Sequence, residues 1–194
     1  MSHGVIEGYA KAAPDLVTQF GAIDAEAHLA PVRAFLPDSP ARVIDVGAGT
    51  GTEAVWLASL GHSVVAVEPV VQFHQAGAIE WREDRLPDLQ LIMAGAQRYD
   101  LVLALGVIQH LEPQEQYKSI ETLNRLTAPG GRLILSLRHG PGHPDRQVFD
   151  IDVDAILDCA ACAGLTLCSR QAAGSLQEAN RAAGVVWTWL VLDR

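Results

Sequence analysis

The residues with the clearest chemical potential surround a short glycine-rich segment. Residues 45–51 read DVGAGTG and follow an apolar run. Glycines after a strand let the backbone turn tightly and approach a ligand without a Cβ in the way, and a helix that begins at once offers free N–H groups. Ligands of open α/β sheets bind outside the carboxyl ends of the strands. The pattern predicts a cofactor site built on Asp45, Gly47, Ala48 and Gly49.

The glycine spacing helps to separate two cofactor classes. A dinucleotide fingerprint, GxGxxG, needs its third glycine at position 52, which is Thr52. Asp45 lies two residues before the first glycine, where a carboxylate would repel a pyrophosphate. It suits a cation, and S-adenosylmethionine carries a sulfonium and an ammonium group but no phosphate. Glu68, which ends the next apolar run, could accept hydrogen bonds from the ribose hydroxyls of either cofactor.

Short apolar runs rich in Val, Ile and Leu alternate with helical patterns along the chain. The elements that they form must position Asp45, the glycine-rich segment and Glu68. Such continuous runs are typical of strands buried on both faces of a mainly parallel sheet. The expected strands cover residues 43–46, 63–67, 78–82, 101–105, 132–137, 165–169 and 185–192. The expected helices cover residues 52–60, 87–94, 113–126 and 152–163, with a Pro-Gly-Gly turn expected at 129–131.

This alternation predicts the fold class. Right-handed βαβ crossovers would give a three-layer αβα sandwich, with a Rossmann-like, mainly parallel, seven-stranded sheet. The last strand follows its predecessor after a short connection, so we expect it to run antiparallel. The 194 residues fit a single domain. Residues 41–194 would form the cofactor-binding core. Residues 1–40 would form a helical cover, broken at Pro14 and Pro31.

Four segments carry a resemblance to a known family. VIDVGAGTG, VVAVEP, YDLVLALGVIQHL and LTAPGGRLILSL occur in this order between positions 42 and 137, about half of the chain. They resemble successive motifs of the class I S-adenosylmethionine-dependent methyltransferases. One GxGxG would be weak evidence, whereas four ordered segments are strong evidence for the family. They are weak evidence for any particular substrate.

The resemblance implies roles at matching positions near the glycine-rich loop. Asp45 and the backbone of residues 47–49 would hold the methionine part of S-adenosylmethionine. Glu68 would accept hydrogen bonds from the ribose hydroxyls, and Pro69 would pack near the adenine. The alternative for Glu68 is an acid that caps a helix, and the alternative for the glycines is a plain turn.

A second group of implied roles lies further along the chain. Asp84 would meet the adenine amine, with Arg85 and Leu86 beside the ring. Glu83 is an alternative to Asp84, because the segment between Glu68 and this acid is shorter than usual for the family. Asp84 could equally be a solvated loop acid.

The remaining implied roles concern the transferable methyl group. Ala104 and Leu105 end the fourth strand and should pass near the methionine and the methyl. Tyr9 falls in an N-terminal helix whose aromatic residue often lies over the cofactor in such enzymes; packing within that helix is the alternative. His110 is the leading candidate for a general base, because neutral imidazole accepts protons near neutral pH. Its alternative role is to line the pocket.

The stretch 137–146, LRHGPGHPDR, follows the fifth strand on the edge where an acceptor should enter. Gly and Pro favour an irregular loop there, and Arg and His could bind an anionic or polar small molecule. The alternative is a surface connection. We expect no metal at His139, His143 and Asp145, because such a loop would hold ligands poorly. Trp187 and Trp189 alternate on the last strand and are interpreted as part of a sheet face.

Composition narrows the partners. The formal net charge of -9 disfavours nucleic acid, and no apolar run is long enough for a membrane helix. The start of the chain shows no signal-peptide pattern, so we expect a cytoplasmic location. We also expect a monomer or a homodimer. The CxxC formed by Cys159 and Cys162 lies in an apolar helical pattern and is interpreted as small buried hydrophobes rather than a zinc pair.

These observations favour S-adenosylmethionine-dependent methyl transfer to a small-molecule acceptor, with S-adenosylhomocysteine as the product. Two alternatives stay open. One is an NAD-type Rossmann oxidoreductase, which Thr52 and Asp45 disfavour. The other is a non-catalytic protein that binds S-adenosylmethionine.

Overall fold

A computed structural model describes residues 1–77 and 79–194; Ala78, expected at the start of the third strand, lies outside the described residues. The described elements are α1 (His3–Gly21), α2 (Ala25–Leu29), the 3-10 helix η1 (Ala30–Phe35), β1 (Arg42–Val46), α3 (Thr52–Ser59), β2 (Ser63–Val67), η2 (Val71–Phe73), β3 (Glu80–Arg82), α4 (Gln90–Ala94), β4 (Tyr99–Leu105), η3 (Ile108–His110), α5 (Pro113–Leu126), β5 (Thr127–His139), α6 (Val153–Cys162), β6 (Thr166–Gly174), α7 (Glu178–Ala182) and β7 (Val186–Asp193).

The strands form one seven-stranded sheet in the order β3-β2-β1-β4-β5-β7-β6. β1 is parallel to β2 and β4, and β4 is parallel to β5. β7 pairs antiparallel with both β5 and β6. The predicted fold class is confirmed, including the antiparallel last strand. The chain moves outward from β1 to β3 and then returns to β4, so the order reverses between β1 and β4.

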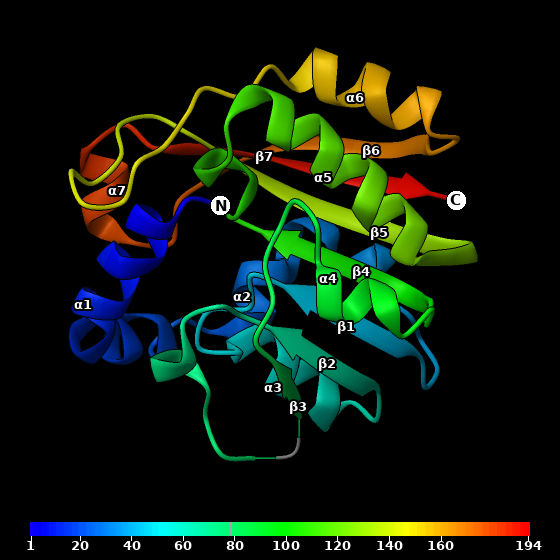
Figure 1. Cartoon of the computed structure of the whole chain (residues 1–194), viewed down its shortest axis with the longest axis horizontal. Coiled ribbons are helices and arrows are strands. Elements are labelled where there is room, and N and C mark those ends of the chain that lie inside the picture. Colours follow the sequence, from blue (N-terminus) through cyan, green and yellow to red (C-terminus); the bar gives the residue numbers. More distant parts are fainter. Residues whose placement is uncertain (78) are drawn as a thin grey trace.

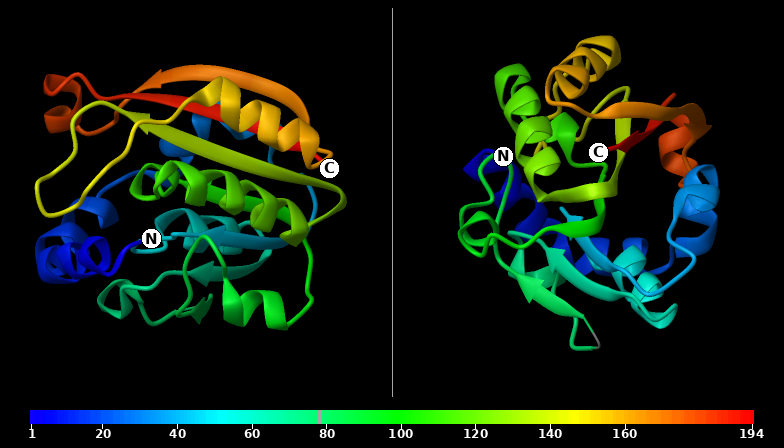
Figure 2. Two further views of the ribbon diagram at one scale, coloured as in Figure 1. Left: turned by 45° about the horizontal axis from the view of Figure 1, so that its top comes forward. Right: turned by 90° about the vertical axis from the view of Figure 1, so that its right-hand side faces the viewer.

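Helices cover both faces of the sheet, which explains the continuous apolar character of the strands (Figures 1 and 2). On one face, Ile44 and Val102 pack in a cluster with residues of α4, α5 and α6. On the other, Val43 and Leu101 pack with residues of α2, η1 and α3. Neighbouring residues of one strand therefore belong to different clusters, as the period of two requires.

Helix α1 runs unbroken through Pro14, so the predicted break at this residue is wrong. An internal proline costs a helix roughly 3 kcal/mol, because it removes a backbone hydrogen bond. Packing offsets that cost: Ala13 and Leu16 are buried in a cluster with Val70 and Phe73. Within the predicted cover of residues 1–40, α1 is therefore a continuous helix over the ends of the strands, and α2 and η1 follow it. Pro31 does lie at a helix start, in η1.

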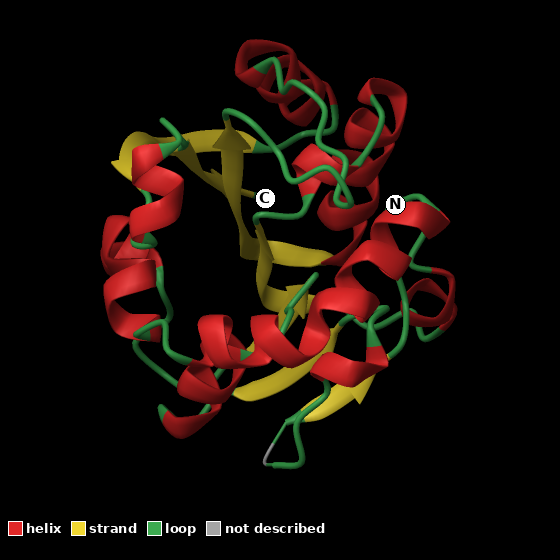
Figure 3. Ribbon diagram, turned by 90° about the vertical axis from the view of Figure 1, so that its left-hand side faces the viewer, coloured by secondary structure: helices red, strands yellow, loops and turns green. Residues whose placement is uncertain are grey.

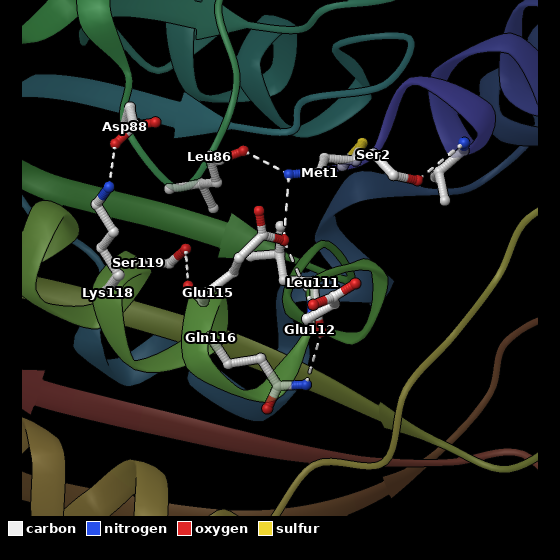
Figure 4. Close-up of polar contacts among 11 residues, drawn as sticks. Met1, Ser2, Leu86, Asp88, Leu111, Glu112, Glu115, Gln116, Lys118 and Ser119 are labelled. Atoms are coloured by element: carbon white, nitrogen blue, oxygen red, sulfur yellow. Dashed lines mark hydrogen bonds and ion pairs between the residues drawn. The ribbon is translucent and has the colours of Figure 1, made fainter.

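The start of the chain is held by polar contacts with the loop before α4 and with helix α5 (Figure 4). The Met1 amino group donates to the carbonyl of Leu86 at 2.7 Å and lies 3.8 Å from the Glu115 carboxylate of α5. The Ser2 hydroxyl accepts from the backbone N–H of Val5 and caps α1. These contacts fix the direction in which α1 crosses the edge.

Two further predictions are corrected. Residues 129–131 form no separate turn, because β5 begins at Thr127 and continues through them with Gly130 in the left-handed region. A Cβ on Gly131 would lie 2.9–3.1 Å from three carbonyl oxygens, so glycine lets β5 pass close to β4 there. Cys162 is exposed and Cys159 is half-buried, so the pair is not buried as expected. Within the described residues, no helix is both long and apolar enough to cross a membrane.

Candidate active site

A cavity of about 1010 Å³ opens at the carboxyl ends of the parallel strands. Figure 3 views this edge, with helices arranged around the strand ends. Helix α1, the segment after β5 and helix α7 all lie along it (Figure 1). Because ligand cavities begin at about 300 Å³, a cavity of this size has room for a cofactor and a small acceptor. The predicted site residues that line it are Tyr9, Asp45, Gly47, Ala48, Gly49, Glu68, Leu105 and His110.

The glycine-rich loop follows β1 at the point where the strand order reverses. Gly47 has φ +75°, and a Cβ there would lie 2.9 Å from the Val107 side chain of the loop after β4. Gly51 also has φ +75°, and its Cβ would lie 2.8 Å from the Trp81 ring. Any larger residue would therefore strain the backbone and displace a neighbour. Gly47 thus lets the loops after β1 and β4 meet at the cavity, and Gly51 lets the end of the glycine-rich loop pack against β3.

Three carboxylates line the cavity beside this loop. Asp45 is 2% exposed, and its Oδ2 has no hydrogen-bond partner among the described residues. Burial raises the pKa of Asp45 well above its usual range, and the nearby Glu53 and Glu68 raise it further. Glu53 is half-buried and bonds the His28 ring at 2.6 Å. A bound cation would offset the cost of ionising Asp45 in this surrounding.

Glu68 directly follows β2 and holds the glycine-rich loop. Its carboxylate accepts from the backbone N–H of Gly49 at 3.0 Å and of Val70 at 2.9 Å. Burial raises the pKa of Glu68 to about 7, although both hydrogen bonds oppose the shift. The alternative role of Glu68 as an acid that caps a helix has some support, because Val70, whose N–H it accepts, directly precedes η2. The same carboxylate nevertheless lines the cavity.

The structure does not bring every predicted residue to the cavity. Asp84 accepts from the backbone N–H groups of Leu91 and Ile92, at 2.8 and 3.0 Å, and so holds the start of α4. Leu86 is buried in the core under the same helix. This use explains why α4 begins only at Gln90. The predicted residues absent from the cavity lining are Pro69, Asp84, Arg85, Leu86 and Ala104; their cofactor roles stay predictions.

Tyr9 and His110 form a hydrogen-bonded pair inside the cavity. The Tyr9 hydroxyl lies 2.8 Å from His110 Nε2, and His110 Nδ1 lies 2.7 Å from the carbonyl oxygen of Gln147. A carbonyl oxygen only accepts, so Nδ1 carries the proton and Nε2 accepts from Tyr9. Burial lowers the pKa of His110 below its ordinary value and raises the pKa of Tyr9 to about 12. Both groups are therefore neutral near pH 7.

Two arginines lie on the same side of the cavity as this pair. Arg138 lies near the end of β5 and donates to the carbonyls of Gly140 and Pro141, at 3.2 and 2.7 Å. The Arg146 guanidinium lies 5.2 Å from the centre of the Tyr9 ring. Both side chains are half-buried and line the cavity. The predicted acceptor loop thus faces the cavity through part of its length.

Some cavity residues were not predicted from the sequence. Phe20 of α1 and Phe73 of η2 form an aromatic wall with ring centroids 6.1 Å apart. Trp187 and Trp189 belong to β7, as expected, but they also line the cavity. Gly8 of α1 does not line the cavity, but it marks where the segment after β5 packs against α1, next to the carbonyl of Asp145. A glycine inside a helix costs about 1 kcal/mol, so its position in the sequence was a signal of such a close contact.

The residues present fit S-adenosylmethionine. Its two positive charges match a cavity end lined by Asp45, Glu53 and Glu68, and the unpartnered Asp45 Oδ2 can accept from an ammonium group. The backbone at Gly47 and Gly49 has φ +75° and +54° and presents no Cβ. A pyrophosphate would meet the same carboxylates, which disfavours a dinucleotide.

Comparison with known proteins places the chain in a family. The family described as "Methyltransferase domain" matches residues 21–186. The chain is 31% identical over 110 residues to the ubiquinone biosynthesis O-methyltransferase of Cereibacter sphaeroides, covering 52% of this chain and 42% of that protein. It is 31% identical over 117 residues to the demethylmenaquinone methyltransferase of Renibacterium salmoninarum, covering 56% and 46%. The chain therefore spans less than half the length of these curated relatives.

Solved structures share the fold. The 1,6-didemethyltoxoflavin-N1-methyltransferase of Burkholderia thailandensis has a TM-score of 0.74 at 18% identity, with 98% of this chain and 87% of that chain covered. The magnesium protoporphyrin IX methyltransferase of Synechocystis has a TM-score of 0.62 at 18% identity, with 96% and 80% covered. The former structure holds S-adenosylhomocysteine and the latter S-adenosylmethionine. The predicted family is confirmed: the chain belongs to the methyltransferase-domain family, with the fold of the class I S-adenosylmethionine-dependent methyltransferases.

Proposed function

We propose that this chain transfers the methyl group of S-adenosylmethionine to a small-molecule acceptor, and that Tyr9 and His110 remove the acceptor's proton. The observation that carries the proposal is one cavity that holds both parts of the chemistry. Asp45 and Glu68 lie on its lining with the Tyr9–His110 pair. The volume of about 1010 Å³ admits both molecules.

Asp45, Glu68 and the backbone of residues 47–49 would bind the cofactor at the acidic end. When bound, S-adenosylmethionine supplies an electrophilic methyl group on a sulfonium. The chain's remaining task is to align the acceptor with that methyl and to exclude water. The apolar walls formed by α1, η2 and β7 suit this task, because they keep the reacting groups away from solvent.

The hydrogen bonds define a path for the acceptor's proton. Tyr9 donates its own proton to His110 Nε2, which leaves the lone pairs of its oxygen free to accept from a hydroxyl or N–H of the acceptor. As the acceptor's proton moves to Tyr9, the Tyr9 proton moves to His110. The carbonyl of Gln147 stabilises the resulting imidazolium through Nδ1. The pair thus acts as a general base without an ionised tyrosine.

The relatives support a small acceptor. Their names include an O-methyltransferase of ubiquinone biosynthesis and an N1-methyltransferase of a toxoflavin precursor. An oxygen or nitrogen acceptor that must lose a proton is consistent with the Tyr9–His110 pair. A cytoplasmic location and a monomeric or homodimeric state stay predictions, as does the single-domain assignment of residues 1–194.

Calorimetric titration with S-adenosylhomocysteine and with NAD tests the cofactor. We expect the former to bind at least tenfold more tightly; tighter binding of NAD would overturn the proposal and favour an oxidoreductase. Activity is tested by release of S-adenosylhomocysteine from S-adenosylmethionine with a panel of catechols, hydroxybenzoates and N-heterocycles. Binding without turnover on any of them would favour the non-catalytic alternative.

A further inference from the structure

The cavity has a basic side as well as an acidic one. Arg138 and Arg146 approach it from the end of β5 and from the following segment. The pKa of His110 is lowered by both arginines as well as by burial, so their positive charge reaches the Tyr9–His110 pair. The sulfonium and ammonium groups of S-adenosylmethionine are repelled by these arginines, and its single carboxylate would leave most of the N–H donors of two guanidinium groups free.

Neither guanidinium is neutralised by a carboxylate among the described residues. Arg138 donates only to the backbone carbonyls of Gly140 and Pro141. Arg146 stacks over the Tyr9 ring and makes no ion pair within the described part of the chain. The acid next to it, Asp145, is exposed and lies 3.9 Å from the His143 ring. A half-buried guanidinium that lacks an anionic partner keeps most of its donors free.

The surroundings of these donors define the shape of an acceptor. Tyr9 presents a ring beneath Arg146. The Trp187 ring lies close to Gly106, where a Cβ would be 3.2 Å away. Gly106 follows β4, at the end of the strand expected beside the transferable methyl. Flat apolar walls with a guanidinium at one side match an aromatic ring that carries a carboxylate, because a guanidinium binds a carboxylate in a planar, two-pronged manner.

We propose that the acceptor is an aromatic carboxylate whose anionic group is bound by Arg146 and Arg138 on the basic side of the cavity. This inference rests on the proposed methyltransferase function and specifies its acceptor. The bound carboxylate would fix which hydroxyl or N–H of the ring faces Tyr9. Arg146 would supply most of the binding, because Arg138 already holds two loop carbonyls.

A pair of isosteric probes tests this proposal without turnover. 4-Hydroxybenzoate and 4-hydroxybenzamide differ in charge but hardly in shape. Each is titrated calorimetrically at pH 7 and fixed ionic strength into the chain saturated with S-adenosylhomocysteine. We expect the carboxylate to bind about tenfold more tightly than the amide, as for one charge-assisted contact. R146Q should remove this preference, and Arg146→Lys should restore part of it.

R170Q is the matched control, because Arg170 is exposed on β6, pairs with Asp154 and does not line the cavity. It should keep the tenfold preference. Equal binding of the two probes, no measurable binding of the carboxylate at millimolar concentration, or a preference that survives R146Q would overturn the proposal. The affinity for S-adenosylhomocysteine is measured first in every variant. Its absence in the unmodified chain would count against the methyltransferase function itself, whereas normal affinity without carboxylate preference would count against the acceptor class alone.

Discussion

The two ends of the cavity differ in charge and in the kind of structure that builds them. The acidic end holds Asp45, Glu53 and Glu68 and lies at the ends of β1 and β2 and on α3. The basic end holds Arg138 and Arg146 and lies at the end of β5 and in the irregular segment that precedes α6. In the sheet, β4 lies between β1 and β5, so the acidic and basic residues enter the cavity from different strands. The positive groups of a cofactor and an anionic acceptor would be drawn to different parts of the lining.

The comparison also separates two ways of holding a polar group. At the acidic end, strands and positive-φ glycines hold the carboxylates, and the Asp45 Oδ2 is left without a partner among the described residues. At the basic end, the loop is held by contacts with α1, such as that of Arg146 with Tyr9. We therefore expect changes at the acidic end to act on cofactor affinity and changes at the basic end to act on the acceptor and on turnover.

The largest effect is expected for His110→Ala. Loss of a general base typically lowers turnover about 100-fold to 10,000-fold, while affinity for S-adenosylhomocysteine should stay within about twofold because Asp45 and Glu68 are untouched. Steady-state kinetics at saturating cofactor, combined with calorimetry, check both halves. His3→Ala is the control, since His3 is exposed and, among the described residues, its one ion pair is with Glu7. Turnover near that of the unmodified chain would show that His110 only lines the cavity.

The next effect concerns Asp45→Asn. A hydrogen bond to a charged group contributes about 1.5–3 kcal/mol, so affinity for S-adenosylmethionine should fall about 10-fold to 100-fold. The free protein should become more stable at pH 8, because the raised pKa of Asp45 means that its ionised form costs folding energy above its ordinary pKa. Thermal unfolding without cofactor checks the expected gain in stability, and unfolding with cofactor checks the expected loss of affinity.

Asp100→Asn is the same chemical change at a carboxyl whose pKa is shifted in the opposite direction. Arg42 donates to Asp100 and lowers the pKa of that carboxyl. Its ionised form therefore stabilises the fold above its ordinary pKa, and its loss should destabilise the chain slightly without changing cofactor affinity. If Asp45→Asn behaved like Asp100→Asn, Asp45 would be a structural acid rather than a cofactor ligand.

The acidic end was the more predictable from the sequence. Val, Ile and Leu runs predict the strands, and an Asp followed by glycines after a buried strand predicts both the turn and the charge of its ligand. What the sequence did not show at this end was a local contact. Asp84 has the right type and position for an adenine contact, but the start of α4 takes its carboxylate. Sequence spacing cannot reveal that a short helix will claim a side chain.

At the basic end, the sequence predicted which residue types are present but not how they are positioned. Arg and His in a Gly-Pro loop indicate a polar pocket, but the contacts that position Arg146 come from α1, more than a hundred residues earlier. The link between Tyr9 and His110 also joins distant segments. Such pairs follow from tertiary packing, in which Ala13 and Leu16 hold α1 across the strand ends despite Pro14. No local pattern carries this information.

A pH titration separates the two ends, because cofactor affinity and turnover should begin to fall at different pH values as the pH is lowered. Protonation of Glu68 removes a negative charge beside the cofactor, so affinity for S-adenosylmethionine should weaken, by up to about tenfold, as the pH falls through about 7. Turnover at saturating cofactor should hold to a lower pH, because burial keeps the pKa of His110 below its ordinary value. Calorimetry and kinetics between pH 5.5 and 8.5 would reveal two limbs. A constant affinity from pH 6 to pH 8 would contradict the role of Glu68.

The smallest effect is expected for Gly8→Ala, which probes the contact that closes the basic end. A Cβ on Gly8 would lie 1.9 Å from the carbonyl oxygen of Asp145, so the loop that carries Arg146 must move. Inside a helix, alanine stabilises the fold by about 0.5–1 kcal/mol relative to glycine, whereas an overpacked contact destabilises it by about 1–3 kcal/mol. We expect a net loss of about 1 kcal/mol, which lowers Tm by about 2–4 °C. Affinity for S-adenosylhomocysteine should be unchanged.

Gly4→Ala in the same helix supplies the control with the opposite sign. Nothing lies within 4 Å of a Cβ at Gly4, so the change should raise Tm through helix propensity alone. Differential scanning calorimetry of the two variants compares identical chemical changes one turn apart. If Gly8→Ala also raised Tm, the loop would adapt freely to α1, and Arg146 would lack the fixed position that selection of an anionic acceptor requires.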